Sequence, residues 1–188
     1  MEKTLLATLA TCALCLLVII PRPGRADGGW IDEAKLGLLA HDVPLFDPHI
    51  ENGVDVNGEL LFKPLTAFPG IGTLRPHLGM TVNTEGETSY AYTGLTGTAK
   101  LIDGVFRPGD GIFGSLGLGG AIHDNSNTGS PGHVGLGSRL LFHEELDLGY
   151  RFAGAADVSL FMDHLSNADI GRHNPGMTNL GIRTGYNF

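Results

Sequence analysis

Two residues near the C-terminal end, His164 and Ser166, have types and a spacing suited to nucleophilic catalysis. A serine hydroxyl is a poor nucleophile until a base takes its proton, and histidine titrates in the range that this task needs. On a β-strand, side chains two positions apart point to the same side, about 7 Å apart along the chain, so the imidazole can lean toward the hydroxyl. If this segment is a strand, the pair predicts an ester hydrolase site.

The segment around the pair alternates as a strand with one apolar face does. Val158, Leu160 and Met162 have the same parity as His164 and Ser166. The pair thus continues an apolar stripe at the point where a membrane strand would leave the hydrocarbon. We expect both side chains on a lipid-facing wall, level with lipid ester bonds. The alternative is that they are polar residues that only mark the membrane boundary.

The rest of the chain contains seven further runs of the same alternation, and no linker indicates a second domain. The eight runs are 34–40, 54–62, 74–83, 89–101, 111–123, 134–152, 157–166 and 179–188. Longer polar connections alternate with generally tighter ones, as in outer-membrane barrels. Only helices and closed barrels satisfy every backbone group in lipid. The sequence therefore predicts an all-β, eight-stranded antiparallel transmembrane β-barrel.

The run 134–152 supports a barrel over a soluble core. Its even positions from Leu140 onward are mostly apolar, and its odd positions include His143, Glu145 and Asp147. Burying so many charges in a soluble core is costly, whereas a small barrel interior can hold them as a paired network. Glu144 lies on the apolar face, and the pattern does not explain it.

The first residues predict an exported protein. Residues 5–20 are almost all apolar or small, and Gly24 and Ala26 are the small residues of a cleavage site. We expect a signal peptide over 1–26 and the barrel over 27–188. A retained anchor helix is disfavoured by the short apolar run, and lipoprotein processing at Cys15 is a weaker alternative. Both cysteines lie in the removed segment, so neither disulfide nor thiolate chemistry is expected.

Charge and motif spacing exclude several function classes. The first 26 residues hold three of the 12 Lys and Arg and one of the 20 Asp and Glu, so the remaining chain has a formal net charge of −10. Such a chain is a poor nucleic-acid binder. No histidine spacing or glycine-rich loop indicates a metal or phosphate site, so we expect no metal and no cofactor.

The His-Ser pair lies in a longer string that carries a family resemblance. The string comprises His164-Leu165-Ser166-Asn167-Ala168, then Asn174-Pro175-Gly176, then Gly-Ile-Arg-Thr-Gly-Tyr-Asn-Phe over 181–188. It resembles the PagL family of lipid A 3-O-deacylases, also described as acyloxyacyl hydrolase-like proteins. The resemblance covers the C-terminal quarter of the chain. It implies an eight-stranded outer-membrane barrel that removes an ester-linked acyl chain from lipid A on the barrel exterior.

The resemblance also implies roles for single residues. Ser166 matches the nucleophile and His164 the general base, and Asn167 and Asn174 match asparagines near the oxyanion. The two asparagines also fit turn chemistry, since Asn is common in loops.

The family's third catalytic residue is a glutamate, and its place falls on Thr178. Threonine brings no negative charge, but its hydroxyl can accept a hydrogen bond and hold the tautomer of the imidazole. Asp169, in the intervening loop, is an alternative carboxylate. The efficiency of catalysis depends on this departure.

Together these features predict an outer-membrane serine esterase of a Gram-negative bacterium, with lipid A or lipopolysaccharide as substrate. One alternative is a small non-catalytic barrel with a structural or binding role, which the missing glutamate favours. Another is a soluble periplasmic β-sandwich. The acyl chain and position cleaved, and the formation of a homodimer, are left open by the sequence.

Overall fold

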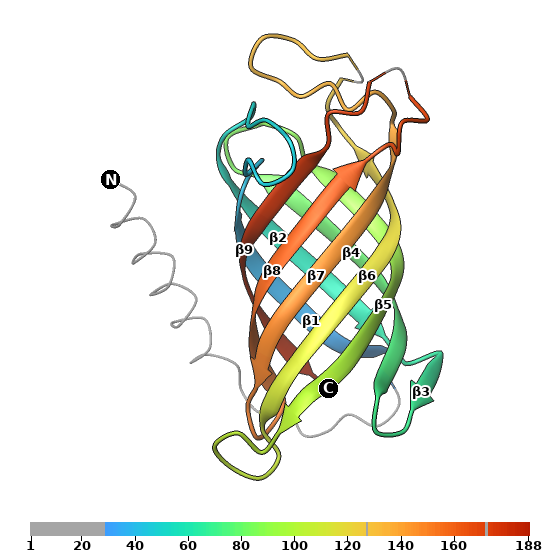
Figure 1. Ribbon diagram of the computed structural model, residues 1–188, viewed down its shortest axis with the longest axis vertical. Helices are drawn as coiled ribbons and strands as arrows, with labels where there is room; N and C mark the ends of the chain where they lie inside the picture. The colour runs from blue at the N-terminus through green and yellow to red at the C-terminus, as the bar shows by residue number, and fades with distance from the viewer. Residues whose placement is uncertain (1–28, 127, 172) are drawn as a thin grey trace, which may run out of the picture.

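A computed structural model describes residues 29–126, 128–171 and 173–188. The strands of these residues are β1 (Ile31–Ala40), β2 (Val54–Phe62), β3 (Thr66–Phe68), β4 (Gly72–Asn83), β5 (Tyr90–Asp103), β6 (Gly111–His123), β7 (Leu140–Arg151), β8 (Ala156–Ser166) and β9 (Met177–Asn187). All neighbours are antiparallel, and the pairings β1–β9 and β2–β4 close the sheet into a barrel (Figure 1). This confirms the predicted fold class. The predicted signal peptide lies outside the described residues.

Two predicted segments differ from the structure. The run 134–152 becomes a strand only from Leu140, because Val134 and Leu136 are buried in a loop. They pack with Leu165 in a hydrophobic cluster. Because both apolar residues are needed there, the loop sequence alternates as a strand does. The connection between β2 and β4, where the sequence predicts no strand, contains the short strand β3, which pairs with the first residues of β4.

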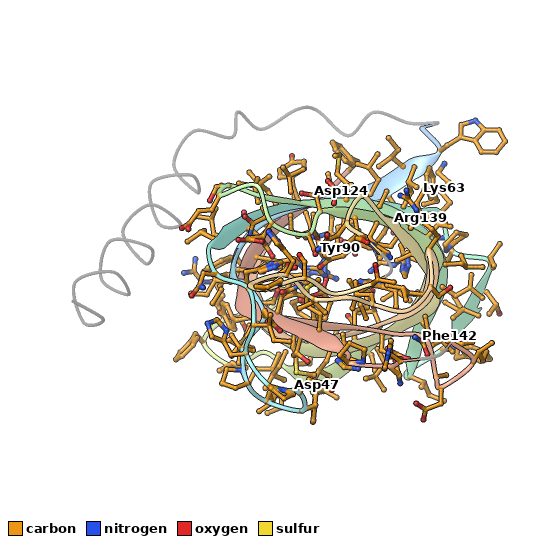
Figure 2. The ribbon with its side chains drawn as sticks, turned by 90° about the horizontal axis from the view of Figure 1, so that it is seen from above. Asp47, Lys63, Tyr90, Asp124, Arg139 and Phe142 are labelled. Carbon is orange, nitrogen blue, oxygen red and sulfur yellow. The ribbon has the colours of Figure 1, made fainter. Side chains whose placement is uncertain are left out.

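Alternate residues of the long strands face the lumen and the outer wall. In β8, Phe161 and Asp163 are fully buried, whereas Leu160 is 55% exposed. Viewed from above, the side chain of Tyr90 lies inside the ring of strands and Phe142 lies outside it (Figure 2). Apolar side chains therefore cover the wall, as lipid contact requires. Within the described part of the chain, no helix is long and apolar enough to cross a bilayer.

Buried ion pairs fill the lumen. The guanidinium of Arg183 contacts Glu59 at 3.0 Å and also Asp147, and the ammonium of Lys35 donates to Asp147 at 2.8 Å. Arg183 is fully buried and stacks over the ring of Phe161 at 3.6 Å. Charges of this kind are tolerated in a barrel interior because they pair with one another.

The two ends of the barrel differ. The described residues of the connections 41–53, 84–89, 124–126, 128–139, 167–171 and 173–176 lie together at the upper end in Figure 1. The connections 63–71, 104–110 and 152–155 and the C-terminus lie at the other end. β8 ends at Ser166, which places the predicted catalytic pair just below the long loops.

Candidate active site

Strands β7, β8 and β9 place a row of polar side chains across the outer wall near its loop end. His164 of β8 is paired with Glu144 of β7 on one side and Thr178 of β9 on the other. His164 and Ser166 are half-buried, and the residue between them, Leu165, is fully buried. The two predicted side chains thus share the outer face, as the parity of the strand requires.

The imidazole of His164 is held from β9. Its Nδ1 lies 2.8 Å from the Oγ1 of Thr178, which is fully buried. When Nδ1 carries the ring proton and donates it to this hydroxyl, Nε2 keeps a lone pair and can act as a base. Thr178 therefore orients the ring as a catalytic acid would, but it adds no charge.

Gly176 makes room for the other edge of the same ring. Continuing the register one step beyond the pair Leu165–Met177 places Gly176 opposite Ser166. A Cβ at Gly176 would lie only 2.5 Å from Cε1 and 2.9 Å from Nε2 of His164. The edge that carries Nε2 thus lies over Gly176, at the level of Ser166 on the neighbouring strand.

Ser166 lies beside an apolar depression in the wall. Its partner in β7 is Phe142, which lines a cavity of about 280 Å³ together with Gly120, Leu140 and Ile170. Among the described residues, the hydroxyl of Ser166 forms no hydrogen bond, either with His164 or with another group. The hydroxyl is therefore free to turn toward the imidazole or toward a molecule in the depression.

The two predicted oxyanion residues have different surroundings. The side-chain amide of Asn167 donates to the carbonyls of Leu136, at 2.9 Å, and of His173. Both hydrogens of this side-chain amide are thus used within the loops, so the role of Asn167 near the oxyanion stays a prediction. Asn174 accepts a bond of 2.8 Å from the backbone N–H of Asn167 through Oδ1. Within the described residues its Nδ2 makes no hydrogen bond.

A tight turn follows Asn167. The N–H of Ile170 donates to the carbonyl of Asn167 at 3.0 Å, and Ala168 and Asp169 between them have φ values of 51° and 60°. These are the dihedrals of a type I′ turn, which alanine rarely adopts. Asp169, the alternative carboxylate of the sequence analysis, is exposed on this turn.

The loop 41–53 covers the histidine from above. Its Val43 N–H donates to the carbonyl of Thr178 at 2.7 Å, and the ring of Phe46 meets the ring of His164 edge-on at 5.8 Å. The Oδ2 of Asp47 would lie 2.5 Å from a Cβ at Gly176. These contacts could not be predicted from the sequence, because the sequence of a loop does not indicate which strand the loop packs against.

A buried carboxylate braces the loops. Glu51 accepts hydrogen bonds from His41 at 2.9 Å, from Thr88 at 3.0 Å and from the Val134 N–H at 2.7 Å. Burial disfavours the charge of both ionisable groups, but hydrogen bonds outweigh it. Those with Asp55 and Glu51 raise the pKa of His41 to about 9, and those with His41 and the loop donors lower the pKa of Glu51 to about 2.

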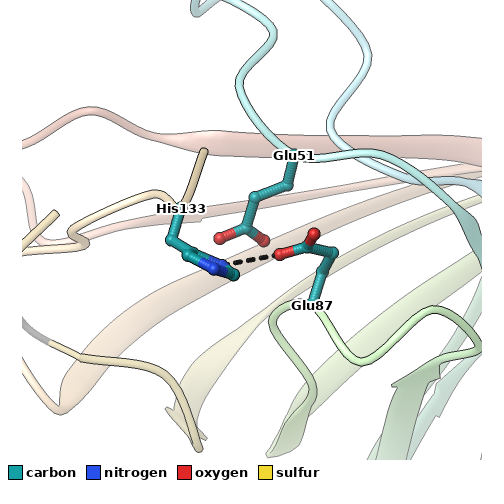
Figure 3. Close-up of side chains that lie close together, drawn as sticks. All are labelled: Glu51, Glu87 and His133. Carbon is teal, nitrogen blue, oxygen red and sulfur yellow. Dashed lines mark ion pairs between the residues drawn. The ribbon is translucent and has the colours of Figure 1, made fainter. Parts of the chain in front are cut away.

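In the described part of the chain, two clusters of acidic and histidine side chains lie outside this row. Glu51, Glu87 and His133 come from three loops, with Glu87 and His133 joined at 2.7 Å (Figure 3). The second cluster, in the lumen, comprises Glu59, His77 and Glu145. Sequence spacing indicated neither, since each draws on distant segments. The oxygens of Glu51 already accept hydrogen bonds, so the loop cluster reads as a brace between loops.

The fold and the side chains on the outer face of the barrel define the class of this protein. A closed barrel with charged side chains inside and apolar side chains outside is a small outer-membrane β-barrel. Residues 65–187 match the family model of lipid A 3-O-deacylase (PagL). The chain belongs to this family and is an outer-membrane protein.

Solved structures agree in fold. The crystal structure of the outer membrane enzyme PagL is 17% identical over 83% of this chain and 99% of that chain, with a TM-score of 0.66. Neisserial surface protein A is 10% identical over 83% of this chain and 95% of its own, with a TM-score of 0.51. None of the curated proteins matches the chain. At identities this low, the structural matches establish only the shared barrel fold. The assignment to the family rests on the match to the family model.

Proposed function

We propose that the chain hydrolyses an ester-linked acyl chain of lipid A, with Ser166 as nucleophile and His164 as base. The observation that carries this proposal is the hydrogen bond between Nδ1 of His164 and Thr178 on the outer wall. With Nδ1 as the donor of this bond, Nε2 is the proton acceptor, on the ring edge that lies over Gly176 at the level of Ser166. A lipid in the outer leaflet reaches this wall without leaving the membrane.

The chemistry follows from these atoms. Ser166 Oγ attacks the ester carbonyl while its proton passes to Nε2 of His164. The tetrahedral intermediate collapses by breaking the bond to the sugar oxygen, which takes the proton from His164 and leaves as a hydroxyl. Water then attacks the acyl-enzyme, again losing its proton to His164, and the fatty acid and free Ser166 are released.

Two further features have roles in the proposal. The free Nδ2 of Asn174 is the better donor to the oxyanion, a contribution of roughly 3–4 kcal/mol in comparable sites. The amide of Asn167 instead holds the loops through the carbonyls of Leu136 and His173. The apolar depression beside Ser166 offers a surface for an acyl chain.

Mass spectrometry of lipid A tests the proposal. Membranes that contain the wild-type protein are expected to lose one acyl chain from lipid A, and Ser166→Ala should abolish the loss. Ser130→Ala is the matched control, since Ser130 is an exposed loop serine. If wild type and Ser166→Ala give identical spectra, the chain is a non-catalytic barrel and the proposal is wrong.

A further inference from the structure

Among the residues that the structure describes, the carboxylate of Glu144 on the outer wall has neither a hydrogen-bond nor an ion-pair partner. Glu144 lies on the lipid-facing side of β7, where Phe142 and Leu146 on either side are each 42% exposed. Its Oε2 is buried and has no hydrogen-bond partner. Among the described residues, no cation lies within 4.0 Å of its carboxylate. A charge held in an apolar wall without a partner is costly, so its presence calls for a role.

The neighbour of Glu144 on β8 is His164. Side chains that face each other on paired antiparallel strands have Cβ atoms about 4.5–5.5 Å apart, so the carboxylate and the imidazole are direct neighbours on the wall, with their oxygen and nitrogen atoms more than 4.0 Å apart. Glu144 approaches from the β7 side, opposite to Thr178, which binds Nδ1 from β9. The ring of His164 thus lies between a hydroxyl that orients it and a carboxylate that does not hydrogen-bond to it.

Other titratable groups around His164 are less suited to assist it. Asp47, from the loop 41–53, lies at the edge of the ring that carries Cε1 and Nε2, where the proton of the nucleophile must arrive. A carboxylate there competes for that proton. Asp169 and His173, in the loop 167–176, are exposed. The residues that face it from β9 and from the end of the preceding loop, Thr178 and Gly176, carry no charge.

We propose that Glu144 supplies the negative charge that the Thr178 position lacks, and that it acts as a positioning residue which stabilises the His164 imidazolium. The inference rests on the proposed function, since the imidazolium forms only when His164 takes a proton. Thr178 then holds the tautomer and Glu144 provides the charge, so that two residues share what one acid does in a Ser-His-Asp triad. An opposite charge on the facing side chain favours the protonated ring.

Kinetics of the purified full-length protein in detergent micelles, with lipid A as substrate, test the assignment. Glu144→Gln keeps the shape of the side chain and removes its charge. It should lower kcat about 10- to 100-fold with little change in KM. The acid limb of the pH–rate profile, which reports protonation of the base, should move to lower pH. Glu85→Gln, the same change on an exposed loop residue, should change nothing.

Rescue distinguishes a positioning role from a structural one. Adding Thr178→Glu to Glu144→Gln places a carboxylate beside Nδ1 and should restore most of the lost kcat. A Glu144→Gln protein with wild-type kcat and pH profile would overturn the inference. So would a loss of kcat with an unmoved acid limb and no rescue, because that pattern marks a packing defect.

A readout without turnover separates this inference from the proposed function. The imidazole NMR signals of His164 should shift in Glu144→Gln relative to wild type, and should not shift in Glu85→Gln. If wild type does not deacylate lipid A but this shift is seen, the proposed function fails and the coupling of Glu144 to His164 stands. If wild type is active and the shift is absent, the coupling fails alone.

Discussion

Replacing Gly176 by alanine should slow lipid A hydrolysis about 100-fold without unfolding the barrel. The new Cβ would lie 2.5 Å from Cε1 and 2.9 Å from Nε2 of His164. Carbon atoms in contact need about 3.5–4.0 Å, so the ring must retreat by about 1 Å. Such a displacement breaks the 2.8 Å contact with Thr178. A misplacement of about 1 Å at a reacting group costs on the order of 100-fold in rate.

The assay is the initial rate of fatty-acid release from lipid A in micelles, at saturating and at low substrate concentration. We expect the loss in kcat, because the depression beside Ser166 is untouched. The matched control is Gly58→Ala in β2, where a Cβ meets nothing within 4 Å. Circular dichroism and thermal unfolding should be unchanged in both variants, since Gly176 precedes β9 and is not among the glycines with positive φ.

A Gly176→Ala protein that is folded and has wild-type kcat would refute the reasoning, because the ring would not need the space above Gly176. The same Cβ would also lie 2.5 Å from Oδ2 of Asp47. If Asp47→Ala restores the rate of Gly176→Ala, the loss came from a displaced loop, and the contact with His164 is not its cause.

Two further predictions concern the lumen and the loops. Arg183→Met should lower the free energy of unfolding by about 3–5 kcal/mol, measured by denaturant titration in lipid vesicles, since Glu59 and Asp147 lose their buried partner; unchanged stability would contradict the paired lumen. The hydrogen bonds of protonated His41 stabilise the folded loops fully below pH 6.5, and this stabilisation is lost as the pH rises through about 9. The hydrogen bonds of ionised Glu51 stabilise the folded loops fully above pH 4.5, and this stabilisation is lost as the pH falls through about 2. Proteinase K should therefore cut the loops more readily at pH 9.5 than at pH 6, and Glu51→Gln should reduce that difference, since the bond of His41 with Asp55 remains.

The barrel was predictable because lipid and lumen demand opposite side chains at alternate positions. Leu160 and Asp163 of β8 show this rule plainly, and the ranges predicted for β2 and β6 coincide with the strands. The rule fails for Val134 and Leu136. These apolar residues are two positions apart because both pack into the hydrophobic cluster at the loop end of the barrel, although they lie in a loop. Alternation alone cannot separate a strand from an extended loop whose side chains point inward.

Within the site, contacts between residues close together in the sequence could be predicted, whereas contacts between distant segments could not. His164 and Ser166 share one strand, so parity alone places them on one face, and the family resemblance supplied Thr178. Glu144 could not be placed beside His164, because the register of β7 against β8 was unknown and a shift of one residue turns a side chain to the other face. The side-chain partners of Asn167 could not be predicted for a related reason, since Leu136 and His173 belong to loops.

Ion pairs between charged side chains fill the lumen, while the polar side chains of the candidate active site lie on the outer face of the same sheet. Permeability and turnover are therefore separate properties of this molecule. Substrate arrives sideways by two-dimensional diffusion, and its effective concentration is a mole fraction in the leaflet. Diluting lipid A with inert lipid or detergent at constant bulk concentration should then slow the reaction, and no leak of small solutes need accompany it.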